Sequence, residues 1–142
     1  RERYDPKEKV YLLKEEYEAS GGKEIFLSFE NKDRTKLFSY LRLRIPSQVF
    51  EKRKHFLPVL ENSAIIREIQ TFGEMIPIGI KKIAPQHRGL GKKLIKEAEK
   101  ITKKEFRLNK IVAISGIGVR NYWRNLGYKL KGTYMIKEIK RG

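Results

Sequence analysis

Apolar and polar residues alternate along two neighbouring stretches of the chain, residues 25–30 and residues 37–45. A period of two is typical of a β-strand, because successive side chains point to opposite faces. The polar residues 31–36 suit a turn between the two stretches. Pro46 suits the end of the second strand, since proline donates no ladder hydrogen bond. The pattern therefore predicts a β-hairpin.

A helical spacing of apolar residues begins at Leu90. One side of the predicted helix is formed by Leu94, Ile95, Ala98 and Ile101. Lysines occupy most of the other positions, as expected for a solvated side. Glu99 precedes Lys103 by four residues, which predicts an ion pair along the same helix.

The rest of the pattern predicts a mixed α+β (or α/β) domain. The further elements expected are a loop over residues 47–62, strands over 64–72 and 78–80, a buried parallel strand over 111–114, a short helix over 121–126 ending at Gly127, and a last strand over 133–139. Residues 1–22 are polar and end in two glycines, so we interpret them as a lead-in or linker from a preceding domain, with residues 23–142 as one domain. The first residue is Arg1, so we expect a piece of a longer polypeptide.

Charge and composition narrow the function. The net charge of +16 attracts polyanions, with nucleic acid the first candidate. A lysine-rich solvated surface from a heat-adapted organism is the alternative. The absence of Cys excludes disulfides, iron–sulfur clusters and thiolate metal sites within this chain, and two His residues make an all-protein zinc site unexpected. No apolar stretch approaches the ~20 residues of a membrane span and no secretory signal is present, which predicts a cytoplasmic protein.

The segment with recognisable chemistry is Gln86-His87-Arg88-Gly89-Leu90-Gly91, at the head of the predicted helix. A helix start exposes unpaired N–H groups and a partial positive charge, and glycines let an anion approach the backbone. The segment therefore predicts a phosphate cradle. The Rossmann pattern needs a third glycine and the Walker pattern needs a Ser or Thr after Lys92, so neither is met. A plain glycine-rich helix entry is the alternative.

A second feature lies downstream, where Asn121-Tyr122-Trp123-Arg124-Asn125-Leu126-Gly127-Tyr128 follows a strand that ends in Ile114-Ser115-Gly116. An aromatic helix ending in Gly-Tyr, together with the Gln-x-x-Gly-x-Gly segment, resembles the GNAT superfamily of acetyltransferases. The resemblance implies the GNAT fold, a mixed and mostly antiparallel splayed sheet flanked by helices. It also implies acetyl-CoA as the cofactor.

The chain resembles one GNAT family more closely, the catalytic subunits of the elongator complex. The similarity runs from about Gly21 to the end and is carried by residues 21–30, 41–46, 66–68, 86–89, 114–122 and 132–135. It implies an acetyltransferase domain of an enzyme that carboxymethylates uridine 34 of tRNA, with acetyl-CoA cleavage stimulated by tRNA. In that family a preceding radical S-adenosylmethionine domain carries the iron–sulfur cluster. The expected partners are therefore tRNA and the remainder of the same polypeptide, and the composition suggests an archaeal origin.

The resemblance also assigns site residues. The cofactor would pair with a strand and with the helix start, through Glu68, Ile69, Gln70, Thr71, Gln86, Arg88, Gly89, Leu90, Gly91, Lys92, Tyr122 and Trp123. Glu68 is the candidate base, with an ion pair to Arg67 as the alternative. Trp123 stands where many superfamily members place the Tyr that protonates the leaving thiolate, and Trp has no comparable acid. Adjacent Tyr122 is therefore the catalytic candidate, unless the reaction needs no such donor. Gln70 stands where this family is expected to have His.

Basic residues are expected to hold tRNA phosphates, which position the RNA without reading its bases. The predicted nucleic-acid-binding residues are Arg42, Arg44, Arg53, Lys54, Arg120 and Arg124, and a generic basic surface is the alternative. Two other functions stay open. One is a lysine N-acetyltransferase acting on histone-like proteins, which an acidic patch near the thioester would favour. The other is a non-catalytic nucleic-acid-binding module with a decayed cofactor site.

Overall fold

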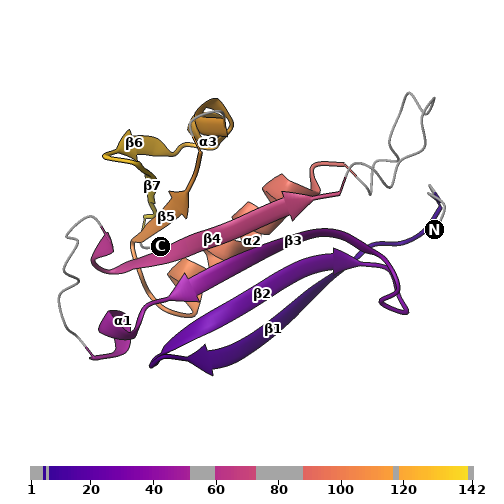
Figure 1. Cartoon of the computed structure of the whole chain (residues 1–142), viewed down its shortest axis with the longest axis horizontal. Coiled ribbons are helices and arrows are strands. Elements are labelled where there is room, and N and C mark those ends of the chain that lie inside the picture. The colour runs from indigo at the N-terminus through magenta and orange to yellow at the C-terminus, as the bar shows by residue number, and fades with distance from the viewer. Residues whose placement is uncertain (1–4, 6, 52–59, 73–87, 117–118, 141–142) are drawn as a thin grey trace.

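The computed structural model describes residues 5, 7–51, 60–72, 88–116 and 119–140. Within these residues, seven strands form one sheet in the order β1-β2-β3-β4-β5-β7-β6 (Figure 1). The strands are β1 (Tyr11–Ala19), β2 (Gly22–Glu30), β3 (Leu37–Ile45), β4 (Ser63–Thr71), β5 (Lys110–Ile114), β6 (Lys129–Lys131) and β7 (Tyr134–Glu138). The helices are α1 (Ser47–Glu51), α2 (Leu90–Lys104) and α3 (Arg120–Asn125). Of the strand neighbours, β4 and β5 are parallel and the others are antiparallel.

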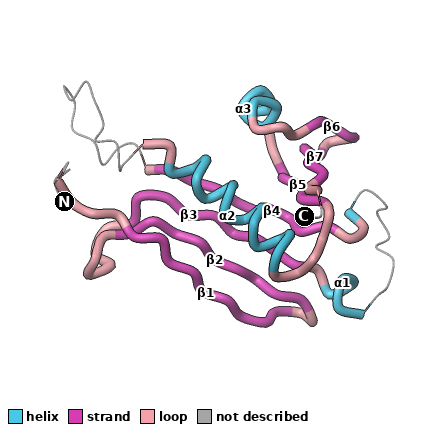
Figure 2. Tube along the Cα trace, turned by 180° about the vertical axis from the view of Figure 1, so that it is seen from behind, coloured by secondary structure: helices cyan, strands magenta, loops and turns pink. Residues whose placement is uncertain are grey.

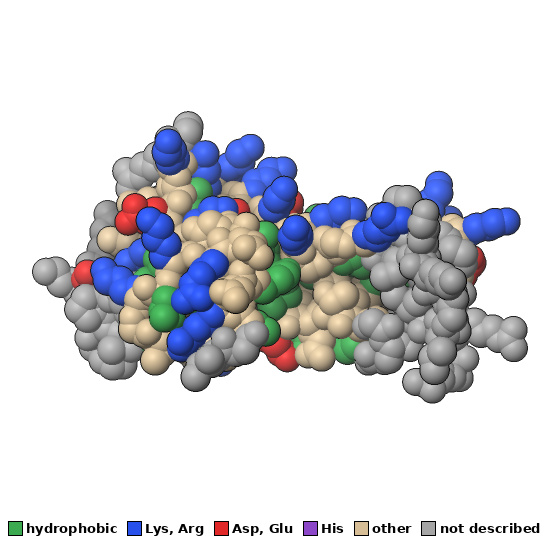
Figure 3. Space-filling model, turned by 90° about the horizontal axis from the view of Figure 1, so that it is seen from above, with side chains coloured by type: hydrophobic (Ala, Val, Ile, Leu, Met, Phe, Trp, Pro, Cys, Tyr) green, Lys and Arg blue, Asp and Glu red, His purple; other side chains and the backbone are tan. Residues whose placement is uncertain are grey.

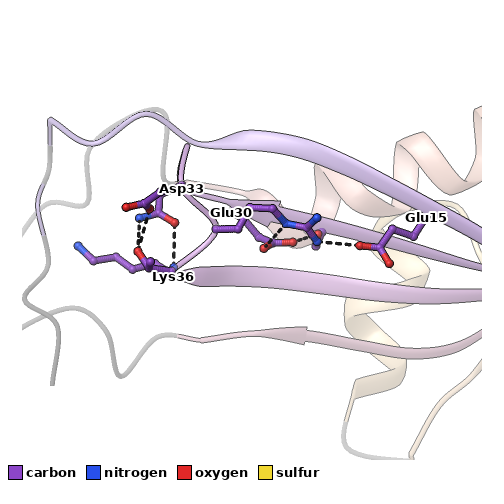
Figure 4. A network of polar contacts seen from close by, with 8 residues as sticks. Glu15, Glu30, Asp33 and Lys36 are labelled. Carbon is purple, nitrogen blue, oxygen red and sulfur yellow. Dashed lines mark hydrogen bonds and ion pairs between the residues drawn. The ribbon is translucent and has the colours of Figure 1, made fainter.

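The predicted hairpin is formed by β2 and β3. Its turn is held by polar contacts, as the backbone N–H of Lys36 donates to the Asn31 side chain at 2.8 Å. Arg34 donates to Glu30 at 3.3 Å and to Glu15 of β1 at 2.7 Å (Figure 4). The turn therefore links all three N-terminal strands.

Strand β1 lies within residues 1–22, which the sequence pattern separated as a lead-in. It pairs with β2 along its whole length, from Tyr11 opposite Glu30 to Ala19 opposite Gly22. An edge strand leaves most of its side chains in solvent, so it lacks the apolar alternation that reveals a half-buried strand. Strand β6 also escaped prediction, because three residues are too few to show a period. The start of the loop predicted over residues 47–62 forms α1 instead.

Helix α2 covers one face of the sheet (Figure 2). Its predicted apolar stripe is buried, with Leu94, Ile95, Ala98 and Ile101 at most 2% exposed. The stripe belongs to one core with the inward side chains of β2, β3 and β4. Burial of each large aliphatic side chain contributes roughly 1.5–3 kcal/mol. The core thus fixes the position of α2, and with it the glycine-rich turn at its start.

Glu99 of α2 does not form the ion pair predicted with Lys103. Its carboxylate accepts hydrogen bonds from the Tyr128 hydroxyl at 2.8 Å and from Lys137 Nζ at 3.1 Å. Lys137 Nζ also donates to the Leu126 carbonyl at 3.0 Å. Fixed donors on neighbouring elements stabilise a half-buried carboxylate more than a partly exposed lysine on the same helix does. The contact joins α2 to β7 and to the end of α3.

The opposite face of the sheet carries no helix among the described residues, and we call it the helix-free face. Phe50 of α1 packs against Phe106, which follows α2, and the Glu99 contacts place the end of α3 on the α2 side as well. Phe26 and Tyr40 stack on the helix-free face, with ring centroids 5.4 Å apart. The described side chains on this face therefore belong to the sheet itself.

Candidate functional site

Strands β4 and β5 separate after a short paired stretch. Parallel pairing joins Ser63–Ile66 to Lys110–Ala113, whereas the later part of β4 pairs with β3 alone in the described structure. A β-bulge interrupts the β3–β4 register between Arg42 and Leu43, next to the point of separation. Bulges bend a strand and are enriched beside active sites. Among the described residues, the edge of β4 beyond Ile66 that faces away from β3 has no partner strand, and this free edge presents backbone N–H and C=O groups with which another extended chain can pair.

A cleft of about 460 Å³ lies where the strands separate. Its described lining residues are Glu68, Ile69, Gln70, Thr71, Gly91, Ile114, Ser115, Gly116, Val119, Tyr122 and Trp123. The four consecutive β4 residues predicted to contact a cofactor are all among them, as are Gly91, Tyr122 and Trp123. The predicted cofactor contacts did not include Val119 or residues 114–116, which also line the cleft. The small-residue turn directly after a buried strand is the sequence signal that could have indicated residues 114–116.

The start of α2 forms one wall of this cleft. Gly89 precedes the helix in a left-handed conformation, with φ of 60°. The backbone N–H of Lys93 makes the first intrahelical hydrogen bond, to the Gly89 carbonyl at 3.0 Å. The amides of Leu90, Gly91 and Lys92 precede that bond and have no acceptor within the helix. Three amides and the positive end of the helix dipole together suit an anionic group.

The remaining predicted residues of this segment have different surroundings. The side chain of Leu90 is buried in the core, so it can reach a ligand only through its amide. Arg88 and Lys92 are exposed at the helix start. Gln86 lies outside the described residues.

Side chains of α3 and β4 lie close to Gly91 of α2. A Cβ atom added there would lie 3.2 Å from the Tyr122 hydroxyl and 3.3 Å from Thr71 Oγ1. Both separations are below ordinary van der Waals contact, so a side chain at this position would displace a neighbour. Even an alanine here would therefore need Tyr122 or Thr71 to shift by a few tenths of an ångström.

The two aromatic residues of α3 have different environments. Trp123 is 3% exposed and packs edge to face on Tyr128, with centroids 4.9 Å apart. Tyr122 is 40% exposed, and partial burial of its hydroxyl raises the pKa above its ordinary value of 10. Tyr122 therefore keeps its proton at neutral pH. Gly127 ends α3 as predicted, with φ of 94° and hydrogen bonds from its own N–H and that of Tyr128 back into the helix.

Glu68 lies in a polar network at the mouth of the cleft. Its carboxylate accepts hydrogen bonds from the Tyr40 hydroxyl at 2.5 Å and from Arg42 Nε at 3.1 Å. The bond to Glu68 raises the pKa of Tyr40. Arg67, which the sequence suggested as an ion-pair partner of Glu68, donates instead to Glu24 at 3.2 Å. Glu68 is thus held in place by two donors from β3.

The residues predicted to bind RNA separate into two groups. Arg42 is paired with Glu68, and Arg44 donates to Glu24 and to the Ala19 carbonyl at 3.2 and 3.0 Å. Arg120 and Arg124 lie on α3 beside the cleft, and Arg120 Nε is buried without a hydrogen-bond partner among the described residues. Arg53 and Lys54 fall outside the described part. The carboxylates therefore neutralise the β3 arginines, which weakens their case as phosphate contacts.

Two further observations limit what the site can hold. Among the described residues, no group of His, Cys, Asp and Glu side chains is arranged to hold a metal ion. The helices that the structure describes include none with the length and apolar character needed to span a membrane.

Comparisons with known proteins agree with this geometry. No family model matches the chain. It is 46% identical, over 95% of its length, to a tRNA uridine(34) acetyltransferase of Methanocaldococcus infernus, and 41% identical over 93% to Elongator complex protein 3 of Saccharomyces cerevisiae. It spans 24% of the length of each of these relatives.

Solved structures give the same picture. The archaeal Methanocaldococcus infernus Elp3 with an N-terminal deletion matches 95% of this chain with 31% of its own, at a TM-score of 0.76 and 44% identity. A GNAT-family acetyltransferase of Listeria monocytogenes matches 80% of this chain with 64% of its own, at a TM-score of 0.51 and 19% identity. The second match supports the fold alone, and the chain has the GNAT fold.

Proposed function

We propose that this chain, which is similar over 95% of its length to part of a tRNA uridine(34) acetyltransferase, is the acetyl-CoA-binding portion of an enzyme that modifies uridine 34 of tRNA. One observation supports this above all. The free edge of β4, the uncapped start of α2 and the Tyr122 side chain all line or border a single cleft.

The residues present fit acetyl-CoA. The edge of β4 over Glu68–Thr71 would pair with the amides of the pantetheine arm, as an added strand does. The amides at the start of α2 would hold the pyrophosphate, and no described heavy atom lies within 4 Å of the Cβ position of Gly89 at that turn. When bound, acetyl-CoA supplies an acetyl group activated as a thioester.

Tyr122 and Glu68 are our candidates for moving protons. Tyr122 carries the hydroxyl of α3 that is exposed at the cleft, and its raised pKa keeps the proton available for a leaving thiolate. Trp123 instead supports the cleft from within the core. Glu68 is oriented by Tyr40 and Arg42 and would accept a proton at the mouth of the cleft.

The charge of the chain favours RNA as the substrate class. Figure 3 shows many Lys and Arg side chains and few Asp or Glu side chains on this face of the molecule. A lysine acetyltransferase would need an acidic surface to dock a basic protein. Among the described residues that line the cleft, Glu68 is the acidic one, and Arg42 already neutralises it. A decayed site is also disfavoured, because the predicted residues still form an open cleft.

The test measures thioester cleavage with radiolabelled acetyl-CoA, alone, with tRNA, and with a basic protein such as histone. We expect tRNA to raise the cleavage rate and histone to leave it unchanged. Replacement of Tyr122 by Phe should keep acetyl-CoA binding and lower cleavage about 100-fold or more. The matched control is Tyr17→Phe, which removes an exposed hydroxyl from β1, away from the cleft.

Three outcomes would contradict the proposal. If acetyl-CoA does not raise the melting temperature of the chain, the cofactor assignment is wrong. If histone is acetylated and tRNA has no effect, the lysine acetyltransferase alternative is correct. If Tyr122→Phe behaves like Tyr17→Phe, the proton donor is another group.

A further inference from the structure

A second hollow, of about 860 Å³, lies over β6, β7 and the start of β5. Lysines from two different strands line it, namely Lys110 of β5 and Lys129 and Lys131 of β6. Ile136 of β7 adds an apolar surface, and Glu138 is the acidic residue among the described lining residues. We call this feature the lysine hollow. Its volume is within the range of small-ligand sites.

Strand register places the three lysines on the same face of the sheet. Their partners on β7 are Glu138 for Lys110, Ile136 for Lys129 and Tyr134 for Lys131. These partners are two residues apart, and directly paired residues share a face. Lys137 has the opposite parity and turns toward Glu99 on the α2 side. The three lysines therefore belong to the helix-free face.

The lysines of the hollow are not neutralised as the arginines of β3 are. None of the three makes a hydrogen bond or ion pair with a described residue, whereas Arg42 and Arg44 each have a carboxylate partner. Burial, together with the charge of Lys131, lowers the pKa of Lys110 and outweighs the opposite effect of Glu61 and Glu138. Like charges directed at one hollow repel each other, and a bound anion would relieve this repulsion.

Protection of a sheet edge explains only part of this arrangement. Lysines on a short edge strand such as β6 prevent pairing with other molecules. Lys110, however, lies on β5, which has β4 on one side and β7 on the other. A third lysine from an interior strand adds nothing to edge protection, but it adds a third positive charge to the lining of the hollow.

The hollow lies close to the cofactor cleft. Ile114 lines the cleft and pairs with Tyr134, which in turn pairs with Lys131. Two strand spacings amount to about 10 Å, so one RNA strand can reach both places. Tyr134 between them is half-buried and offers an aromatic surface on which a base can stack.

We infer that the lysine hollow binds backbone phosphates of the RNA whose nucleotide is presented at the cleft. This inference rests on the proposed function, since it assumes an RNA substrate. It places the RNA across the helix-free face of β5, β7 and β6, and it assigns the phosphate contacts there rather than to Arg42 and Arg44.

The experiment compares tRNA binding by the wild-type chain and by a Lys129→Gln/Lys131→Gln variant at 50 and 200 mM salt. Each lost phosphate contact lowers the salt dependence of log K by about 0.7–0.9. The ratio of the wild-type affinity to the variant affinity should therefore fall about tenfold between 50 and 200 mM salt. The control is Lys100→Gln/Lys104→Gln, which removes two charges from the exposed side of α2 and should retain the wild-type salt dependence.

Acetyl-CoA is the second probe and separates the possible failures. The hollow variant should retain the wild-type rise in melting temperature with acetyl-CoA. If it binds tRNA like the wild-type chain, or if both double variants lose affinity equally, the inference is wrong and the proposed function stands. Loss of the acetyl-CoA response would show that the lysines support the fold, which also overturns the inference. If the wild-type chain binds no tRNA, both proposals fail together.

Discussion

Replacement of Gly91 by Ala should separate folding stability from cofactor binding. Gly91 lies in the first turn of α2, where alanine is favoured over glycine by up to about 1 kcal/mol. The new methyl group would lie 3.2 Å from the Tyr122 hydroxyl and 3.3 Å from Thr71 Oγ1. The end of the partly exposed Tyr122 side chain can move by the few tenths of an ångström required. The free energy of unfolding without ligand should therefore change by less than about 1 kcal/mol.

Acetyl-CoA binding should suffer much more, because the methyl group occupies the gap between α2 and β4. Overpacking of a fitted site costs about 1–3 kcal/mol, which corresponds to a loss of affinity of roughly 5- to 150-fold. At a ligand concentration 100 times the wild-type Kd, binding stabilises the wild-type chain by about 2.7 kcal/mol. A tenfold weaker variant gains about 1.4 kcal/mol at that concentration. Melting curves with and without acetyl-CoA measure this difference directly.

Gly132→Ala, in the turn between β6 and β7 and away from the cleft, is the matched control. Gly132 has φ of 62°, so alanine there adopts a left-handed conformation that costs about 1–2 kcal/mol. A Cβ at this position meets no heavy atom within 4 Å among the described residues. This variant should melt at a lower temperature but keep the full acetyl-CoA shift. If Gly91→Ala keeps the full shift as well, the cofactor does not approach α2 at Gly91.

Two further predictions concern Glu99 of α2 and Lys110 of β5. Replacement of Glu99 by Gln should destabilise the chain by about 1–2 kcal/mol in urea unfolding, because Tyr128 and Lys137 lose a charged acceptor, whereas Glu97→Gln on the same helix should have little effect. Lys110→Gln should raise the melting temperature at pH 7, because burial lowers the pKa of Lys110 below its ordinary value of 10.5 and so disfavours the charged form in the folded state. That penalty is relieved as the pH rises from the lowered pKa toward 10.5, so the advantage of the variant should fade over the same interval. An advantage that grows with pH would contradict this reasoning.

The sequence predicted the elements with a strong periodic signal. The hairpin, β4, α2 and β5 all bury an apolar face or are buried on both sides, and burial imposes the pattern. Strand β1 leaves most side chains in solvent, so backbone pairing and exposed ion pairs hold it and no apolar period records its presence. Separation of β4 from β5 was expected only from the family resemblance. No local pattern reveals where two strands stop pairing.

Pairing of charges was the weakest part of the sequence prediction. Arg42 and Arg44 read as free basic residues, but strand register brings Glu68 opposite Arg42 and Glu24 opposite Arg44. In the same way, Glu99 pairs with Tyr128 and Lys137, which lie 29 and 38 positions further along the chain, and not with Lys103 on its own helix. Such partners depend on tertiary register, whereas net charge depends on composition alone. The total of +16 therefore indicated a polyanion without showing where it binds.

The positions of Tyr122 and Trp123 show the same limit at the cleft between β4 and β5. Adjacent residues on a helix differ in direction by about 100°, so one of the pair faces the core when the other faces the cleft. Helix α3 has six residues, too few for an apolar stripe to show which residue is inside. The structure resolves the choice through Tyr128, which follows the Gly127 cap and packs on Trp123. With Trp123 fixed in the core, Tyr122 is left beside Gly91. A tryptophan at the position where many superfamily members carry the acid therefore still leaves a hydroxyl at the cleft, that of the neighbouring Tyr122.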